Sequence, residues 1–118
     1  MIFGINEEKM KELGAECTIT EIRQQPKLWE ETYNIVKSNE EKIKTFLNKK
    51  LKSNTRIVLT GAGTSDYVGD TIYLYLAKKL NLRVEAIAST DIVSNPAEFI
   101  EEDVPTILVS YARSGNSP

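Results

Sequence analysis

The spacing of apolar residues changes along the chain from a helical period to short runs of β type. Before residue 54 the apolar positions recur every three or four residues, as on one face of an α-helix. This period predicts a polar helix over residues 5–15 and amphipathic helices over 27–37 and 40–52. Two or three helices are therefore expected ahead of the first strand.

Two features suggest where these helices begin and end. Thr18 and Glu21 stand three residues apart, which is the spacing of a capping box at a helix start. Pro26 is expected either to break a helix or to form the first turn of the next one. A boundary is thus predicted near residue 26.

After Asn54 the pattern changes to β-branched apolar runs separated by helical or turn-like segments. Strands are expected at residues 56–60, 83–88 and 106–112, with a helix at 65–81 and one or two short helical turns within 90–103. Strand, helix, strand, helix, strand at this spacing predicts parallel strands joined by right-handed crossovers. The fold class expected is α/β with a doubly wound parallel sheet, residues 1–54 forming a helical segment and residues 55–118 the sheet domain.

Composition and charge narrow the classes of protein. With 118 residues, 41% of them apolar and 27% charged, the chain resembles one soluble globular domain. Its 15 basic and 17 acidic residues are interspersed and give a net charge of −2, so we expect neither a nucleic-acid nor a membrane partner. The single cysteine, Cys17, and the lack of a signal peptide favour a cytoplasmic location.

The chain has no histidine, and with one cysteine it has no ordinary zinc site. The sequence stops at Pro118, just after a predicted strand and loop, where a helix should begin. Because a sheet face would then be left uncovered, we expect an incomplete domain whose catalytic residues lie elsewhere in a longer chain.

Two loops at the carboxyl ends of the predicted strands have the composition of anion sites. Gly61 and Gly63 allow close backbone approach, and Thr64 and Ser65 follow at a helix start, where N–H groups face an incoming anion. The segment 114–117 (Ser-Gly-Asn-Ser) repeats this chemistry after the third strand. Either loop alone could be an ordinary turn and helix cap, but the two together favour a shared phosphate site.

The sequence of the loop after the first strand limits the class of phosphate-containing ligand that it could bind. A dinucleotide fingerprint needs a third glycine where Asp66 stands, and the next glycine is Gly69, although Glu85 lies about where an acid for the ribose could fall. No Gly-Lys pair occurs in the chain, which argues against a nucleoside triphosphate loop. A small phosphorylated metabolite is therefore the remaining candidate for the ligand.

At this point three segments resemble a known family. "GAGTS" followed by "SYARSGNSP" resembles the sugar isomerase (SIS) domain, a flavodoxin-like three-layer fold that binds phosphosugars, and "TEIRQQP" resembles the segment that precedes it in glucosamine-6-phosphate synthase and its relatives. "ASTDIVSNP" resembles the branch of tagatose-6-phosphate ketose/aldose isomerases and galactosamine-6-phosphate deaminases. The resemblance covers residues 18–118.

The resemblance implies a set of substrate-binding residues. The phosphate would be held by Gly63, Thr64, Ser65, Ser114, Gly115, Asn116 and Ser117. Apart from the resemblance, Asp66, Thr90, Asp91 and Arg113 are candidate sugar contacts from their place in the strand-end loops, with helix capping or a solvated charge as the alternative for the aspartates. One departure from the family pattern is Ala112, which stands where the second loop often has its first serine.

The resemblance also implies an activity. It points to an enzyme without a cofactor that binds a hexose 6-phosphate, forms a homodimer or higher homo-oligomer, and moves a proton between C1 and C2, with loss of the amine from an amino sugar. The family's catalytic Glu, His or Lys cannot be matched to any position here. Two alternatives stay open: a phosphosugar-sensing domain of a regulator, which the many glutamates of the N-terminal helices disfavour, and a Rossmann-type NAD-binding domain.

Overall fold

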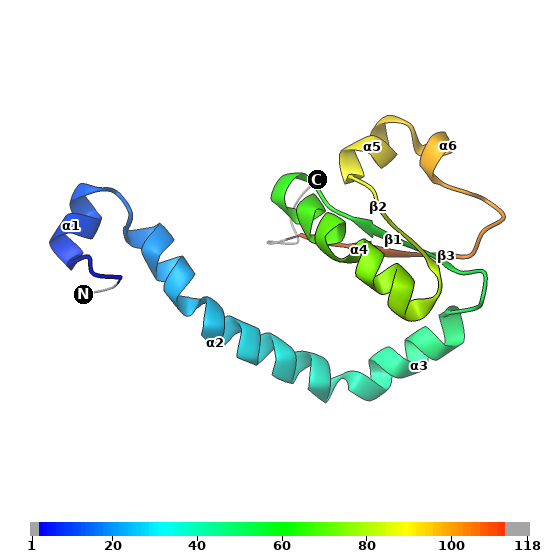
Figure 1. The fold of residues 1–118 in the computed structure, drawn as a ribbon, viewed down its shortest axis with the longest axis horizontal. Helices are drawn as coiled ribbons and strands as arrows, with labels where there is room; N and C mark the ends of the chain where they lie inside the picture. The colour runs from blue at the N-terminus through cyan, green and yellow to red at the C-terminus, as the bar shows by residue number, and fades with distance from the viewer. Residues whose placement is uncertain (1–2, 113–118) are drawn as a thin grey trace. The chain divides into compact units, whose positions relative to one another are not determined.

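The computed structural model describes residues 3–112. The chain divides into two units, Met1–Phe46 and Leu47–Pro118 (Figure 1). The first unit contains helices α1 (Glu7–Glu12), α2 (Glu16–Ser38) and most of α3 (Glu40–Lys50). The second unit contains the end of α3 and all the strands.

Helix α2 runs through Pro26 without interruption, so the predicted boundary there is wrong. The missing N–H of a proline and its clash with the preceding turn cost a helix interior about 3 kcal/mol. The carbonyl left without this N–H belongs to Ile22, which is exposed, so water can satisfy it. The predicted capping box is also wrong, because α2 begins at Glu16 with Ala15 as its N-cap.

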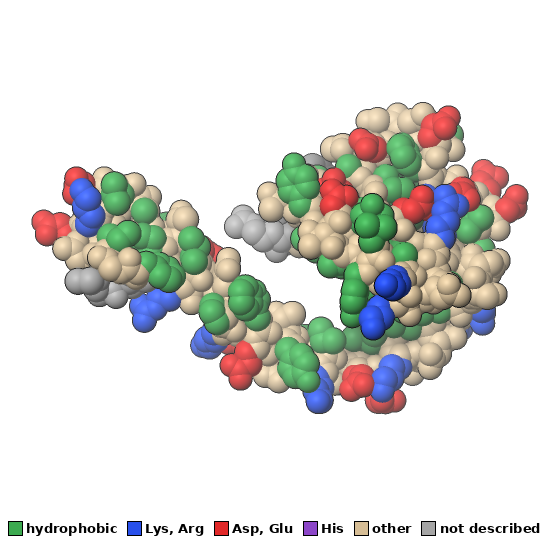
Figure 2. All heavy atoms as spheres, in the orientation of Figure 1, with side chains coloured by type: hydrophobic (Ala, Val, Ile, Leu, Met, Phe, Trp, Pro, Cys, Tyr) green, Lys and Arg blue, Asp and Glu red, His purple; other side chains and the backbone are tan. Residues whose placement is uncertain are grey.

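The first unit carries apolar side chains on its surface. Trp29 and Tyr33 of α2 are 66% and 61% exposed, and Figure 2 shows apolar side chains in green among the charged ones along this unit. Between residues 3 and 112, no helix is both long and apolar enough to cross a membrane.

The second unit is built on three parallel strands in the order β2-β1-β3. The strands are β1 (Arg56–Thr60), β2 (Arg83–Ala86) and β3 (Thr106–Ser110). The helix α4 (Asp66–Leu80) connects β1 to β2, and the short helices α5 (Ser89–Ser94) and α6 (Pro96–Phe99) connect β2 to β3. The α/β fold with a parallel sheet is confirmed.

The strand order places the two connections on opposite faces of the sheet. The first connection moves from the centre to one edge, and the second returns past the centre to the other edge. Right-handed crossovers therefore put α4 on one face and the α5–α6 segment on the other. Figure 1 shows α4 along the sheet and the α5–α6 segment near β2.

The core lies between α4 and the sheet. Ile57, Leu59 and Val84 are buried, and the α4 residues Ile72 and Leu76 pack against them. On the central strand the side chains alternate, so Arg56, Val58 and Thr60 lie on the other face. All five residues of β1 are buried, because this strand is covered on both faces and paired on both edges.

Gly69 allows α4 to approach the sheet closely. A Cβ atom at this position would lie 3.1 Å from the Cβ of Leu59 and 3.3 Å from the Cβ of Ala86. In dinucleotide-binding loops the third glycine permits this kind of close packing. Here the glycine that does so comes three residues later than that fingerprint requires.

We predict that Leu59→Ala will lower the free energy of unfolding by about 3–5 kcal/mol, because Leu59 is 1% exposed and its removal leaves a cavity under α4. Urea denaturation of the two proteins measures the difference. Leu74→Ala is the matched control, since Leu74 of α4 is 67% exposed, and it should change stability by less than about 0.5 kcal/mol. Equal effects of the two variants would contradict the assignment of the core.

Candidate functional site

Backbone hydrogen bonds hold together the loops that follow the three strands. The N–H of Tyr111 donates to the carbonyl of Thr60 at 2.8 Å, and the N–H of Ser89 donates to the carbonyl of Gly61 at 2.7 Å. These bonds extend the parallel pairing of β1 beyond its last residue on both sides. The carboxyl end of the sheet is thus a connected rim formed by three loops.

The first loop turns immediately after β1, and Gly61 is what allows it. A Cβ atom on Gly61 would lie 2.6 Å from the carbonyl carbon of Ser65 and 2.8 Å from the nitrogen of Asp66. The chain then forms the 3₁₀ turn η1 (Gly63–Ser65), in which Gly63 has a φ of 57°. Since L side chains rarely adopt that φ, both glycines have a backbone role.

Ser65 occupies the N-cap position of α4, but its side chain makes no capping hydrogen bond. Helix capping, the usual role of a serine at this position, therefore does not explain Ser65. The N–H of Asp66 donates to the carbonyl of Gly63 in η1, and the dipole of the 15-residue helix favours negative charge at this end. The Ser65 hydroxyl stands at this helix start.

A cleft of about 680 Å³ lies at this rim. Five serine and threonine side chains line it, and they come from η1, α5 and the end of β3: Ser65, Ser89, Thr90, Ser94 and Ser110. The other lining residues are Gly61, Ala62, Val93, Tyr111 and Ala112. No acidic or basic side chain of the described residues lines the cleft, so its walls are neutral and rich in hydrogen-bonding hydroxyls.

A second hollow of about 340 Å³ adjoins this cleft. It is lined by Thr64, Ser65, Val68, Tyr111 and Ala112, and three of these also line the larger cleft. Together the two form one groove that runs from the start of α4 to α5. Their volumes fall in or near the range of about 300–1,000 Å³ that is usual for small-molecule sites.

The structure brings together only part of the residue set predicted from the sequence. Thr64, Ser65 and Thr90 line the groove. Gly63, Asp66 and Asp91 do not line it, and Asp66 has one buried carboxylate oxygen without a partner among the described residues. Arg113, Ser114, Gly115, Asn116 and Ser117 lie outside the described residues, so their predicted roles stay predictions.

Three lining serines were missed in the sequence. Ser89 and Ser94 belong to the short helix α5, and Ser110 is the last residue of β3. A signal for Ser110 was present, because a hydroxyl at the carboxyl end of a parallel strand lies at the edge where ligands bind. Ala112, the departure from the family pattern, faces both parts of the groove.

The described residues offer no metal site. Between residues 3 and 112, no three Asp, Glu, Cys or His side chains come together in a way that could hold an ion. Whatever the groove binds, these residues would hold it by hydroxyl groups and backbone N–H groups.

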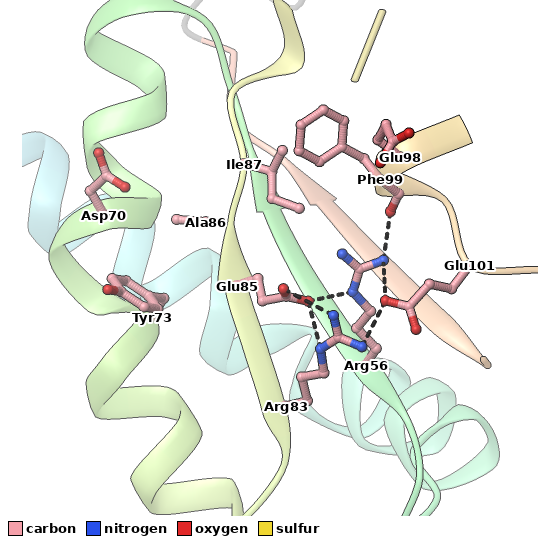
Figure 3. A pocket seen from close by; sticks show the side chains of 10 residues that line it. All are labelled: Arg56, Asp70, Tyr73, Arg83, Glu85, Ala86, Ile87, Glu98, Phe99 and Glu101. Atoms are coloured by element: carbon pink, nitrogen blue, oxygen red, sulfur yellow. Dashed lines mark hydrogen bonds and ion pairs between the residues drawn. The ribbon is translucent and has the colours of Figure 1, made fainter. Parts of the chain in front are cut away.

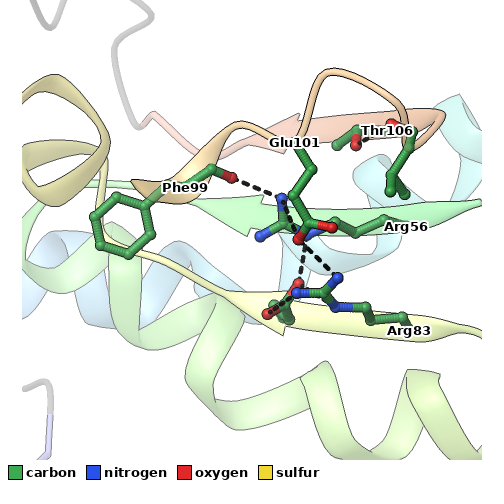
Figure 4. Close-up of polar contacts among 7 residues, drawn as sticks. Arg56, Arg83, Phe99, Glu101 and Thr106 are labelled. Atoms are coloured by element: carbon green, nitrogen blue, oxygen red, sulfur yellow. Dashed lines mark hydrogen bonds and ion pairs between the residues drawn. The ribbon is translucent and has the colours of Figure 1, made fainter. Parts of the chain in front are cut away.

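The amino end of the sheet differs from the groove in charge, because four charged residues form a network there (Figures 3 and 4). Arg56 is 3% exposed and pairs with Glu85, while its Nη1 donates to the carbonyl of Phe99 at 2.6 Å and lies 3.6 Å from Glu101. Arg83 lies 3.0 Å from Glu85 and 2.7 Å from Glu101. The network fastens the segment after α6 to β1 and β2.

This network lowers the pKa of the Glu85 carboxyl. Partial burial by itself would raise the pKa of the carboxyl, but hydrogen bonds from Arg56 and Arg83 outweigh it and hold the pKa of Glu85 below its usual value. Glu85 was the residue that could have held the ribose of a dinucleotide. Because its carboxylate is already paired with two arginines, the NAD-binding alternative lacks the acidic residue that would contact the ribose.

Known proteins of one group match almost the whole chain. The chain is 43% identical to a D-galactosamine-6-phosphate deaminase AgaS from Shewanella sp. (strain ANA-3), over 97% of this chain and 30% of that protein. No protein-family model matches. The chain thus spans about a third or less of the length of the curated relatives it matches.

Two crystal structures match the fold. One, from Clostridium novyi NT, is described as a candidate tagatose-6-phosphate ketose/aldose isomerase and matches with a TM-score of 0.93 and 50% identity, over 100% of this chain and 30% of that one. The other is tagatose-6-phosphate ketose/aldose isomerase from Escherichia coli, with a TM-score of 0.83 and 40% identity over 86% of this chain and 28% of that one. These homologues are named as enzymes, and the resemblance to this branch is confirmed.

We predict that Gly61→Ala will lower the free energy of unfolding by about 2–3 kcal/mol, because the new methyl group would overlap the backbone of Ser65 and Asp66. Gly63→Ala is the comparison. At Gly63 a Cβ meets nothing within 4 Å, so its cost comes from the positive φ alone, about 1 kcal/mol. A Gly63→Ala protein less stable than Gly61→Ala in urea denaturation would contradict the close approach.

We also predict a pH-dependent contribution from Glu85. Because its pKa is lower in the folded state, the stabilisation is fully present above the ordinary glutamate pKa of about 4.3 and is lost as the pH falls through the folded-state value. At pH 7, Glu85→Gln should lower the free energy of unfolding by about 3 kcal/mol, since Arg56 stays charged and buried.

Denaturation at several pH values measures this contribution, with Glu102→Gln as the control because Glu102 is exposed. The difference between wild type and Glu85→Gln should shrink below pH 4, whereas Glu102→Gln should have almost no effect at any pH. A difference that grows as the pH falls would refute the assignment.

Proposed function

We propose that this homologue of the AgaS deaminases and tagatose-6-phosphate isomerases contributes the phosphosugar-binding part of an aldose–ketose isomerase or amino-sugar-phosphate deaminase that acts on a hexose 6-phosphate. The observation that carries the proposal is the neutral, hydroxyl-lined groove at the carboxyl ends of three parallel strands, next to the first turn of α4. Ligands of open α/β sheets bind at this edge.

The two parts of the groove suit the two parts of such a substrate. The smaller hollow, with Thr64 and Ser65, lies where the N–H groups of the α4 start favour an anion, so we place the phosphate there. The larger cleft is lined by five serine and threonine side chains and by Tyr111, and by no charged side chain among the described residues. Hydroxyls that both donate and accept hydrogen bonds match the hydroxyl groups of a sugar.

In the proposed reaction a base moves a proton between C1 and C2 of the open-chain sugar, and an amine at C2 is then lost if the substrate is an amino sugar. None of the groove-lining residues described is a carboxylate, a lysine or a histidine. We therefore assign binding and orientation to residues 61–112 and leave the proton transfer to groups outside the described residues. Ser114, Gly115, Asn116, Ser117 and Arg113 are proposed to complete the phosphate site.

Two other functions make different predictions for the same groove. A sensing domain of a regulator would bind the phosphosugar without turnover, and an NAD-binding domain would bind the dinucleotide. Because Glu85 is paired with Arg56 and Arg83, its carboxylate is not free to contact a ribose, and this argues against the NAD-binding domain. Titration of the full-length protein with NAD and with galactosamine 6-phosphate, while ammonia release and ketose formation are followed, separates the three.

We predict that Ser65→Ala will weaken binding of galactosamine 6-phosphate to the full-length protein by about tenfold or more, because a hydrogen bond to a charged phosphate contributes about 1.5–3 kcal/mol. Isothermal titration calorimetry measures the affinity. Ser53→Ala is the matched control, since Ser53 lies in an exposed turn before β1, and it should bind as the wild type does. Unchanged affinity in Ser65→Ala would rule out this phosphate site.

A further inference from the structure

Thr60 carries a buried hydroxyl that has no hydrogen-bond partner among the described residues. It is the last residue of the central strand β1 and 4% exposed, and its Oγ1 makes no hydrogen bond with any described residue. A buried hydroxyl that forms no hydrogen bond costs stability, whereas valine would fill the same space without that cost. The other fully buried threonine, Thr55, behaves normally, because its Oγ1 accepts from the N–H of Lys52 at 2.8 Å.

The strand register places Thr60 beside a residue of the groove. Thr60 of β1 pairs with Ser110 of β3, and both lie on the sheet face opposite α4. Ser110 is exposed and lines the larger cleft. The backbone at this pair is held by the bond from the Tyr111 N–H to the Thr60 carbonyl at 2.8 Å. The register thus places these two hydroxyl-bearing residues on the same face of neighbouring strands, with Thr60 buried and Ser110 in the lining of the cleft.

We infer that Thr60 is a positioning residue of the phosphosugar cleft, an inference that rests on the proposed function. When a ligand oxygen accepts the hydrogen of the Ser110 hydroxyl, a lone pair of the Ser110 oxygen accepts the hydrogen of Thr60. Thr60 thereby fixes the direction of the Ser110 hydroxyl, and its own hydrogen bond is completed on ligand binding. Because Thr60 is buried, its hydrogen bond to Ser110 is stronger than one made in water.

The contact is with the sugar and not with the phosphate. Ser110 lines the larger cleft together with Ser89, Thr90 and Ser94, and it does not line the hollow with Thr64 at the start of α4. The loss of Thr60 should therefore weaken binding of the sugar phosphate and leave binding of inorganic phosphate unchanged.

The test compares Thr60→Val, which keeps the shape and removes the hydroxyl, with Thr60→Ser, which keeps the hydroxyl. In the full-length protein, Thr60→Val should weaken binding of galactosamine 6-phosphate by about fivefold, with an unchanged affinity for inorganic phosphate and an unfolding temperature equal to or above that of the wild type. Thr60→Ser should bind as the wild type does.

Thr55→Val is the matched control for a buried threonine whose hydroxyl has a structural partner. It should lower the unfolding temperature and leave both affinities unchanged, because the hydroxyl of Thr55 bonds to Lys52 and Lys50 at the end of α3. The variants Thr60→Val and Thr55→Val are thus expected to show opposite effects on stability and on binding.

Four results would overturn the inference. Wild-type protein that binds no sugar phosphate would refute the proposed function together with it. If the wild type binds, Ser65→Ala weakens binding and Thr60→Val does not, the proposed function stands and the role of Thr60 fails. A lower unfolding temperature of Thr60→Val, or equal loss of affinity in Thr60→Val and Thr60→Ser, would show that Thr60 serves packing alone.

Discussion

The groove depends on the central strand β1 more than on any loop residue. This strand is paired on both edges and covered on both faces, and the backbone carbonyls of its last residue and of Gly61 accept hydrogen bonds from the loops that follow β3 and β2. Parallel pairing puts the carboxyl ends of all three strands at one edge. Hydroxyl residues distant in the sequence, such as Ser65, Ser89 and Ser110, therefore lie around one space without any direct bond between their side chains.

Charge is distributed unequally between the two ends of the sheet. At the amino end, Arg56, Arg83, Glu85 and Glu101 neutralise one another and hold the segment after α6 in place. At the carboxyl end, the groove has no charged lining residue among those described. Among the described residues, the groups that can contact a ligand in the groove are therefore hydroxyls and backbone N–H groups rather than fixed charges.

The two glycines nearest the core show how one motif can serve a different ligand class. Gly61 permits the sharp turn after β1, and Gly69 permits the close packing of α4 on Leu59 and Ala86. Both uses occur in dinucleotide-binding loops. What differs is the distance between them, because Asp66 stands where the fingerprint needs its third glycine and Gly69 comes three residues later.

The sequence by itself determined the elements of the sheet domain, because a period of two and a period of 3.6 are local properties of the chain. The strand at residues 56–60 was predicted with its observed bounds for this reason, and the strands predicted at 83–88 and 106–112 and the helix predicted at 65–81 end or begin within two residues of the observed elements. The loop of Thr64 and Ser65 followed from its position after a strand. The break at Pro26 was wrongly predicted, since a proline's local cost does not decide whether the surrounding helix continues.

Only the tertiary structure decided which side chains share the groove and which pair elsewhere. Ser89, Ser94 and Ser110 meet there because of strand order and crossover, and no spacing in the sequence encodes that meeting. Glu85 was assigned a possible ligand role from its position, yet the register places it against Arg56, which lies 29 residues earlier in the chain. Thr60 and Ser110 are neighbours for the same reason. Pairing between distant segments follows from packing and strand register, whereas the pattern along the chain determines only the segments themselves.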